Sequence, residues 1–148
     1  MIDLDDTLFQ THRRIKPEPH FKVATVDKNQ VPLSFMNAKQ QALVEWLSHS
    51  ADLVPVTARS IEALSRVKIE FNHGAICSHG GTILNANNEV DAEWFEIQKS
   101  HIESLGQIMN ELPDLLQSYS KDLGSIRTWS VEENNLKIYT VAKQNDPE

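Results

Sequence analysis

Short apolar runs that alternate with helix-like segments are the feature that most constrains the fold of this chain. Runs typical of buried strands lie at residues 53–56, 75–78 and 82–84. Apolar residues at helical spacing predict a helix at residues 38–48, capped by Asn37, and another after the capping residue Ser60. Strands that alternate with helices favour a parallel sheet. The sequence therefore predicts the α/β fold class.

Further elements are predicted on both sides of this alternation. Polar turns predict two hairpins, one with strands at residues 22–26 and 31–35 and one with strands at residues 126–131 and 136–141. An extended segment is expected at 93–98, followed by a long helix from Ser100 to about Leu123. Pro113 would kink or divide this helix, and Gly124 would end it. The change in pattern predicts two domains, at residues 1–98 and 99–148.

Composition limits the classes of function. A chain of 148 residues with 40% hydrophobic and 24% charged residues is typical of a soluble globular protein. The net charge of −7 disfavours binding to nucleic acid or to an anionic membrane, and no apolar run reaches the length of a membrane-spanning helix. The single cysteine, Cys77, and the absence of a signal sequence at the start favour a cytoplasmic location. Small-molecule chemistry is expected, and the oligomeric state stays open.

Two carboxylates near the N-terminus form the main candidate for chemistry. Asp3 and Asp5 stand two residues apart, so an extended segment turns both toward one site while Leu4 points into the core. One carboxylate beside a magnesium ion can attack phosphorus, and the other can carry a proton. A solvated acidic cluster is the alternative. A calcium loop does not fit, because Leu8 stands where that loop needs glycine and Arg14 where it needs glutamate.

The stretch Asp3-Leu4-Asp5-Asp6-Thr7-Leu8 resembles the first signature of phosphatases of the haloacid dehalogenase (HAD) superfamily. In that family the first aspartate is phosphorylated and the second acts as acid and then base. Magnesium contacts the first carboxylate and the backbone carbonyl of the second aspartate. The resemblance implies that Asp3 is the nucleophile, that Asp5 is the proton carrier, that both lie at the Mg²⁺ ion, and that Thr7 shapes the substrate-binding loop.

Two later stretches also resemble this family. Residues 53–59 resemble its second signature, which implies that Thr57 holds the phosphoryl group with Arg59 beside it. Residues 75–83 resemble a stretch of the members with a large α/β cap, including sucrose-phosphatase-like proteins, although His79 replaces the usual asparagine. Whether His79 contacts substrate stays open. The resemblance implies a Rossmann-like parallel sheet core of HAD type, with the beginning of an α+β cap after residue 98.

Other parts of the family's pattern are missing from the sequence. The lysine that steadies the phosphoryl charge and the late Gly-Asp-x-x-x-Asp motif have no counterpart, and only Met1 and Ile2 precede Asp3. The resemblance thus covers about the first half of a family member, and we expect a truncated chain with weak Mg²⁺ binding and little activity. The expected substrate is a sugar phosphate or a similar small phosphorylated metabolite. The alternative is a non-catalytic module that binds a phosphorylated ligand or a protein partner.

Overall fold

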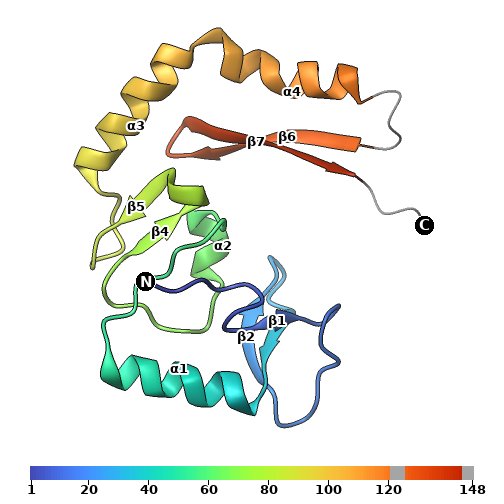
Figure 1. Cartoon of the computed structure of the whole chain (residues 1–148), viewed down its shortest axis with the longest axis vertical. Helices are drawn as coiled ribbons and strands as arrows, with labels where there is room; N and C mark the ends of the chain where they lie inside the picture. The colour runs from blue at the N-terminus through green and yellow to red at the C-terminus, as the bar shows by residue number, and fades with distance from the viewer. Residues whose placement is uncertain (121–125, 145–148) are drawn as a thin grey trace. The chain divides into compact units, whose positions relative to one another are not determined.

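The computed structural model describes residues 1–120 and 126–144 of the chain (Figure 1). It contains two compact units, Met1–Asp91 and Ala92–Glu148. The division falls after Asp91 rather than after residue 98, because a helix begins at Ala92 and continues past that point. Among the described residues no helix is long and apolar enough to cross a membrane. The assignment of the two units to a core and a cap stays a prediction.

The first unit begins with a small antiparallel sheet. Its strands are β1 (Gln10–Thr11), β2 (Lys22–Val26) and β3 (Pro32–Met36), in the order β1-β3-β2. The predicted hairpin is therefore confirmed. Its turn is closed by Asp27, whose Oδ1 accepts the backbone N–H groups of Asn29 and Val31 at 2.8 and 2.9 Å. Such local bonds make aspartate a good turn residue.

Both predicted helices of this unit are present with their predicted caps. Helix α1 (Ala38–Ser50) begins with a capping box, in which the Asn37 side chain accepts from the Gln40 N–H and the Gln40 side chain accepts from the Asn37 N–H. Helix α2 (Ile61–Ser65) begins at Ser60, whose Oγ accepts from the Ala63 N–H at 3.1 Å. These caps satisfy donors that a helix N-terminus leaves unpaired.

The strands of this unit do not form the predicted parallel sheet. Strands β4 (Ala75–Cys77) and β5 (Thr82–Leu84) pair antiparallel, because only the short turn η1 (Ser78–Gly80) and Gly81 join them. A parallel pair would need a connection of about a dozen residues or more. Parallel pairing in the described residues occurs only as isolated bridges, among them Ile2 with Pro55 and Val56 with Ile76. The described chain is thus a mixed α/β structure of four α-helices and small antiparallel sheets.

The main core of the first unit lies directly beneath the acidic N-terminal segment. Its buried members come from that segment, from the β2–β3 hairpin and from the stretch before β4: Leu4, Leu8, Phe9, Ala24, Met36 and Ile69. Half-buried side chains of α1, α2 and neighbouring segments pack against this cluster. The acidic segment is therefore anchored by its own apolar residues, since burial of a leucine or phenylalanine stabilises by about 1.5–3 kcal/mol.

In the second unit, the segment expected to be extended at residues 93–98 is helical. Helix α3 (Ala92–Leu105) includes it, because its half-buried side chains recur at helical spacing, at Trp94, Phe95, Gln98, Lys99 and Ile102. The long predicted helix is divided at Gly106, where φ is 45°, and not at Pro113. Pro113 lies inside the next helix, α4 (Gln107–Tyr119). The predicted end at Gly124 lies outside the described residues.

The predicted C-terminal hairpin is confirmed. Strands β6 (Ile126–Glu133) and β7 (Leu136–Gln144) pair antiparallel, and both α3 and α4 contact this hairpin (Figure 1). The Thr128 hydroxyl donates to the Pro113 carbonyl at 3.1 Å, and Lys137 Nζ donates to Asn110 Oδ1 at 2.8 Å. These bonds and the helix packing hold α4 on the hairpin, which alone would be only marginally stable.

Candidate active site

The acidic segment folds into a tight loop around a buried leucine. The Leu4 carbonyl accepts the backbone N–H groups of Thr7, Leu8 and Phe9 at 3.3, 2.9 and 3.4 Å. Leu4 itself is completely buried, as the predicted alternation requires, whereas Asp3 and Asp5 on either side of it are exposed. The loop therefore presents both carboxylates to solvent from a fixed backbone.

Asp3, the predicted nucleophile, is held by a neighbour in the same loop. Thr7 Oγ1 donates to Asp3 Oδ2 at 2.8 Å. The Thr7 carbonyl in turn accepts from Gln40 Nε2 of α1 at 3.4 Å, so the loop is also tied to the helix that follows the hairpin. A hydrogen bond to one oxygen orients the carboxylate and leaves its second oxygen, Oδ1, to face a reacting partner.

The predicted phosphate-binding threonine follows a segment that pairs with the start of the acidic loop. Ile2 donates its N–H to the Val54 carbonyl at 3.0 Å and accepts from the Val56 N–H at 2.8 Å. This bridge is parallel, so Asp3 and Thr57 leave it in the same direction. Thr57 is buried, and its Oγ1 accepts the Arg59 N–H at 3.1 Å. Because a hydroxyl both donates and accepts, its proton is still available for an anion.

Arg59 joins the second segment to the first through Asp5. Its Nε and Nη2 donate to Asp5 Oδ2 and Oδ1, each at 2.7 Å, in a bidentate ion pair. The guanidinium carbon lies 5.3 Å from the centre of the Phe9 ring, and Nη1 donates to the Ala63 carbonyl at 3.4 Å. Sequence reasoning placed Arg59 at the phosphate but did not indicate its pairing with Asp5, because no local pattern connects residues 54 positions apart.

A turn of unusual conformation adjoins the Thr57–Arg59 segment. Ser78, His79 and Gly80 have φ values of 52°, 56° and 89°, in the left-handed region that residues other than glycine rarely adopt. The Ser78 N–H donates to the Arg59 carbonyl at 2.9 Å, and the His79 N–H donates to the Thr57 carbonyl at 3.2 Å. His79 is exposed beside this segment. A contact between His79 and substrate stays a prediction.

Few groups of the carboxylate loop could bind a magnesium ion. In residues 1–120 and 126–144 no group of three His, Cys, Asp or Glu side chains could hold a metal ion. The Asp5 carboxylate is occupied by Arg59, so Asp3 Oδ1 and the Asp5 backbone carbonyl are the groups that fit the predicted role. Magnesium is often held by one or two carboxylates and completed by water and substrate phosphate. These donors therefore suit a weakly bound ion.

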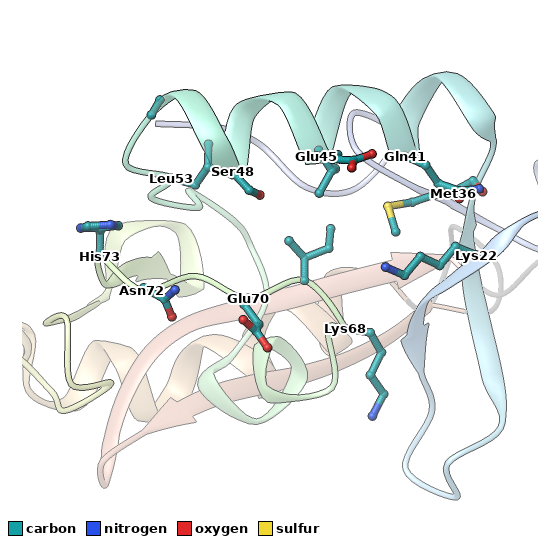
Figure 2. Close-up of a pocket in the computed structure, with 13 residues that line it drawn as sticks. Lys22, Met36, Gln41, Glu45, Ser48, Leu53, Lys68, Glu70, Asn72 and His73 are labelled. Atoms are coloured by element: carbon teal, nitrogen blue, oxygen red, sulfur yellow. The ribbon is translucent and has the colours of Figure 1, made fainter.

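A cavity of about 630 Å³ lies elsewhere in the first unit, between α1 and the stretch before β4 (Figure 2). Asp3, Asp5 and Thr57 do not line it. Its charged lining residues include two lysines, Lys22 and Lys68, and two glutamates, Glu45 and Glu70. This balance of charge gives no preference for an anion, so the carboxylate loop is the stronger candidate despite the size of the cavity.

No protein family matches this chain, and no curated protein matches it at a significant level.

Proposed function

We propose that this chain carries the phosphate-accepting nucleophile of a magnesium-dependent phosphomonoester hydrolase of HAD type. Its Rossmann-like parallel core would be limited to the parallel bridges of Ile2 with Pro55 and of Val56 with Ile76, since the longer strands of the unit pair antiparallel. The observation that carries the proposal is the parallel pairing of Ile2 with the segment before Thr57. Because the two segments run in the same direction, Asp3 and Thr57 both follow the bridge on the same side. The resemblance of the sequence around both residues to the two signatures of that family supports it. The proposed location is the cytoplasm.

In the proposed reaction, Asp3 Oδ1 attacks the phosphorus of a small phosphorylated metabolite such as a sugar phosphate. For this step Asp5 has to carry a proton taken up from solvent on one of the two oxygens that Arg59 contacts. The bond between phosphorus and the ester oxygen breaks, and Asp5 gives that proton to the leaving oxygen. Water then attacks the phosphorus of the aspartyl phosphate, Asp5 takes a proton from that water, and inorganic phosphate leaves with Asp3 regenerated. A bound Mg²⁺ ion would supply neutralisation of the phosphoryl charge.

The chain's own residues have defined tasks in this scheme. Thr7 orients Asp3 through its 2.8 Å hydrogen bond, and the Thr57 hydroxyl donates to a phosphoryl oxygen. We expect slow turnover, because no lysine contacts Asp3 or Asp5 within the described part of the chain. Loss of one group that stabilises developing charge typically lowers the rate about 10²- to 10³-fold.

The test is the formation of a beryllofluoride adduct, an acyl-phosphate mimic, on the purified chain with magnesium. A distinct bound fluorine signal in the nuclear magnetic resonance (NMR) spectrum is expected, and Asp3→Asn should abolish it because the amide lacks the nucleophilic charge. Asp52→Asn is the matched control, since it removes an exposed carboxylate of the same unit that pairs with His73. Absence of the adduct, or its persistence in Asp3→Asn, would falsify the proposal.

A non-catalytic module that binds a phosphorylated ligand is the second candidate. The observation that favours it is the Asp5 carboxylate, both of whose oxygens are taken up by Arg59. For this candidate, inorganic phosphate should bind to the chain and shift the Thr57 amide signal. In addition, p-nitrophenyl phosphate should not be hydrolysed above the level of Asp3→Asn. Hydrolysis of p-nitrophenyl phosphate that is lost in Asp3→Asn would instead support the enzyme.

A further inference from the structure

The geometry points to Arg59 as a positioning residue for the Asp5 carboxylate, in place of the phosphate contact that the sequence predicts for it. This inference rests on the proposed phosphatase function, because it concerns how Asp5 would be aimed for proton transfer. Its basis is the fork of two hydrogen bonds, from Nε and from Nη2, each 2.7 Å long. A bidentate contact fixes the plane as well as the position of a carboxylate.

Arg59 is the fixed member of the pair. Its side chain is only 14% exposed, whereas that of Asp5 is 44% exposed. The guanidinium lies over the fully buried ring of Phe9, and its third nitrogen donates to the Ala63 carbonyl of α2. A guanidinium that is stacked on an aromatic ring and donates hydrogen bonds to both Asp5 and Ala63 has little freedom to move. Asp5 therefore takes its orientation from Arg59.

The same geometry argues against a phosphate contact by Arg59. Nε and Nη2 form one of the two edges by which a guanidinium binds carboxylates or phosphates in the bidentate manner, and Asp5 occupies it. On the other edge Nη1 donates to the Ala63 carbonyl. To bind phosphate there, Arg59 would have to release Asp5. Thr57 can donate to an anion without such a loss, because its oxygen already accepts the Arg59 N–H and keeps its own proton.

A positioning role makes a specific kinetic prediction. A proton from Asp5 matters most when the leaving oxygen is strongly basic, as in an alkyl phosphate, and little when it is weakly basic, as in p-nitrophenyl phosphate. A defect in the aim of Asp5 should therefore depend on the leaving group. A lost phosphate contact would instead weaken binding of both substrates equally.

The first experiment compares hydrolysis of glycerol 2-phosphate and p-nitrophenyl phosphate by the chain and its variants. Arg59→Gln should lower kcat about 10²-fold on the alkyl phosphate and less than about tenfold on the aryl phosphate, with KM little changed. Asp5→Asn should show the same pattern, and the double variant should be no worse than Asp5→Asn alone. Equal losses on both substrates with a raised KM would overturn the inference.

Arg66→Gln is the matched control for general destabilisation. Arg66 is similarly buried, with 17% of its side chain exposed, and its Nη2 donates to Glu62 Oε2 at 3.1 Å in the same unit. It should reduce folding stability to a similar degree without any dependence on the leaving group. Arg59→Lys, which keeps the charge but loses the fork, should fall between Arg59→Gln and the unchanged chain.

A second experiment needs no turnover, so it separates failure of this inference from failure of the proposed function. The Nε–H signal of Arg59 in the nitrogen-proton NMR spectrum should shift in Asp5→Asn and should not respond to inorganic phosphate. A signal that shifts with phosphate but ignores Asp5→Asn would refute the positioning role. If no beryllofluoride adduct forms yet the Arg59 signal depends on Asp5, only the hydrolase assignment fails.

Discussion

The hydroxyl of Thr7 donates a hydrogen bond of 2.8 Å to Oδ2 of Asp3, four residues earlier in the same loop. Thr7→Val keeps the shape of the side chain but removes this bond. The bond holds the Asp3 carboxylate in one orientation, so the affinity for beryllofluoride should fall about tenfold when it is lost, which corresponds to about 1.4 kcal/mol. Titration with beryllofluoride, followed by fluorine NMR, measures this affinity. Thr7→Ser restores the hydroxyl and should restore the affinity; equal affinities for the Val and Ser variants would contradict the prediction.

Thr25 of β2 and its cross-strand neighbour Ser34 of β3 are both fully buried, and neither hydroxyl has a hydrogen-bond partner in the part of the chain that the structure describes. A buried hydroxyl without a partner is destabilising. Thr25→Val should therefore raise the free energy of unfolding by about 1 kcal/mol in urea denaturation. Ser60→Ala is the control of opposite sign, because loss of the α2 cap typically costs about 1 kcal/mol. A Thr25→Val variant that is less stable than the unchanged chain would show that the Thr25 hydroxyl has a hydrogen-bond partner.

Gly74 and Gly80 both have positive φ, at 84° and 89°, but their surroundings differ. A Cβ added to Gly74 would lie 2.3 Å from the Leu84 carbonyl oxygen, whereas one added to Gly80 would meet no atom within 4 Å. Gly80→Ala should therefore cost only the backbone strain of about 1–2 kcal/mol. Gly74→Ala adds an overlap with β5 and should cost about 1–3 kcal/mol more. Thermal denaturation of the two variants tests this order, and equal losses would contradict it.

Burial of the Tyr139 phenol and, to a smaller extent, the nearby Glu133 carboxylate raise the pKa of Tyr139 above its usual value of 10.0. The folded chain then keeps this proton to a higher pH than the unfolded chain. The corresponding stability is present below about pH 10 and is lost as the pH rises through the folded pKa. In Tyr139→Phe this loss should disappear from urea denaturation curves measured across that range.

The same pKa can be observed directly in Tyr119→Phe, because the sequence contains only two tyrosines and this variant leaves one phenol. Ultraviolet absorbance of the phenolate should show a midpoint above 10.0, and adding Glu133→Gln should lower that midpoint. A midpoint at the ordinary value would show that the phenol of Tyr139 is not desolvated in the folded chain.

Elements with strong local signals were predicted well from the sequence. Asn37 and Ser60 were recognised as caps, and both accept the expected backbone N–H groups. The segment at residues 93–98 was mistaken for a strand because its aromatic residues suit strands in isolation. Its side chains instead follow the period of α3. The helix break was assigned to Pro113, whereas Gly106, with its positive φ, ends α3.

The sequence by itself determined the local geometry of the candidate site. Alternation placed Leu4 in the core between two exposed carboxylates, and the Asp3–Thr7 contact spans only four residues. Only the tertiary structure decided that Asp5 pairs with Arg59 and that Phe9 lies beneath the guanidinium. Local bonds depend on a few backbone angles that neighbouring residues set. A contact across 54 positions forms only once the core has fixed both segments, so no local pattern encodes it.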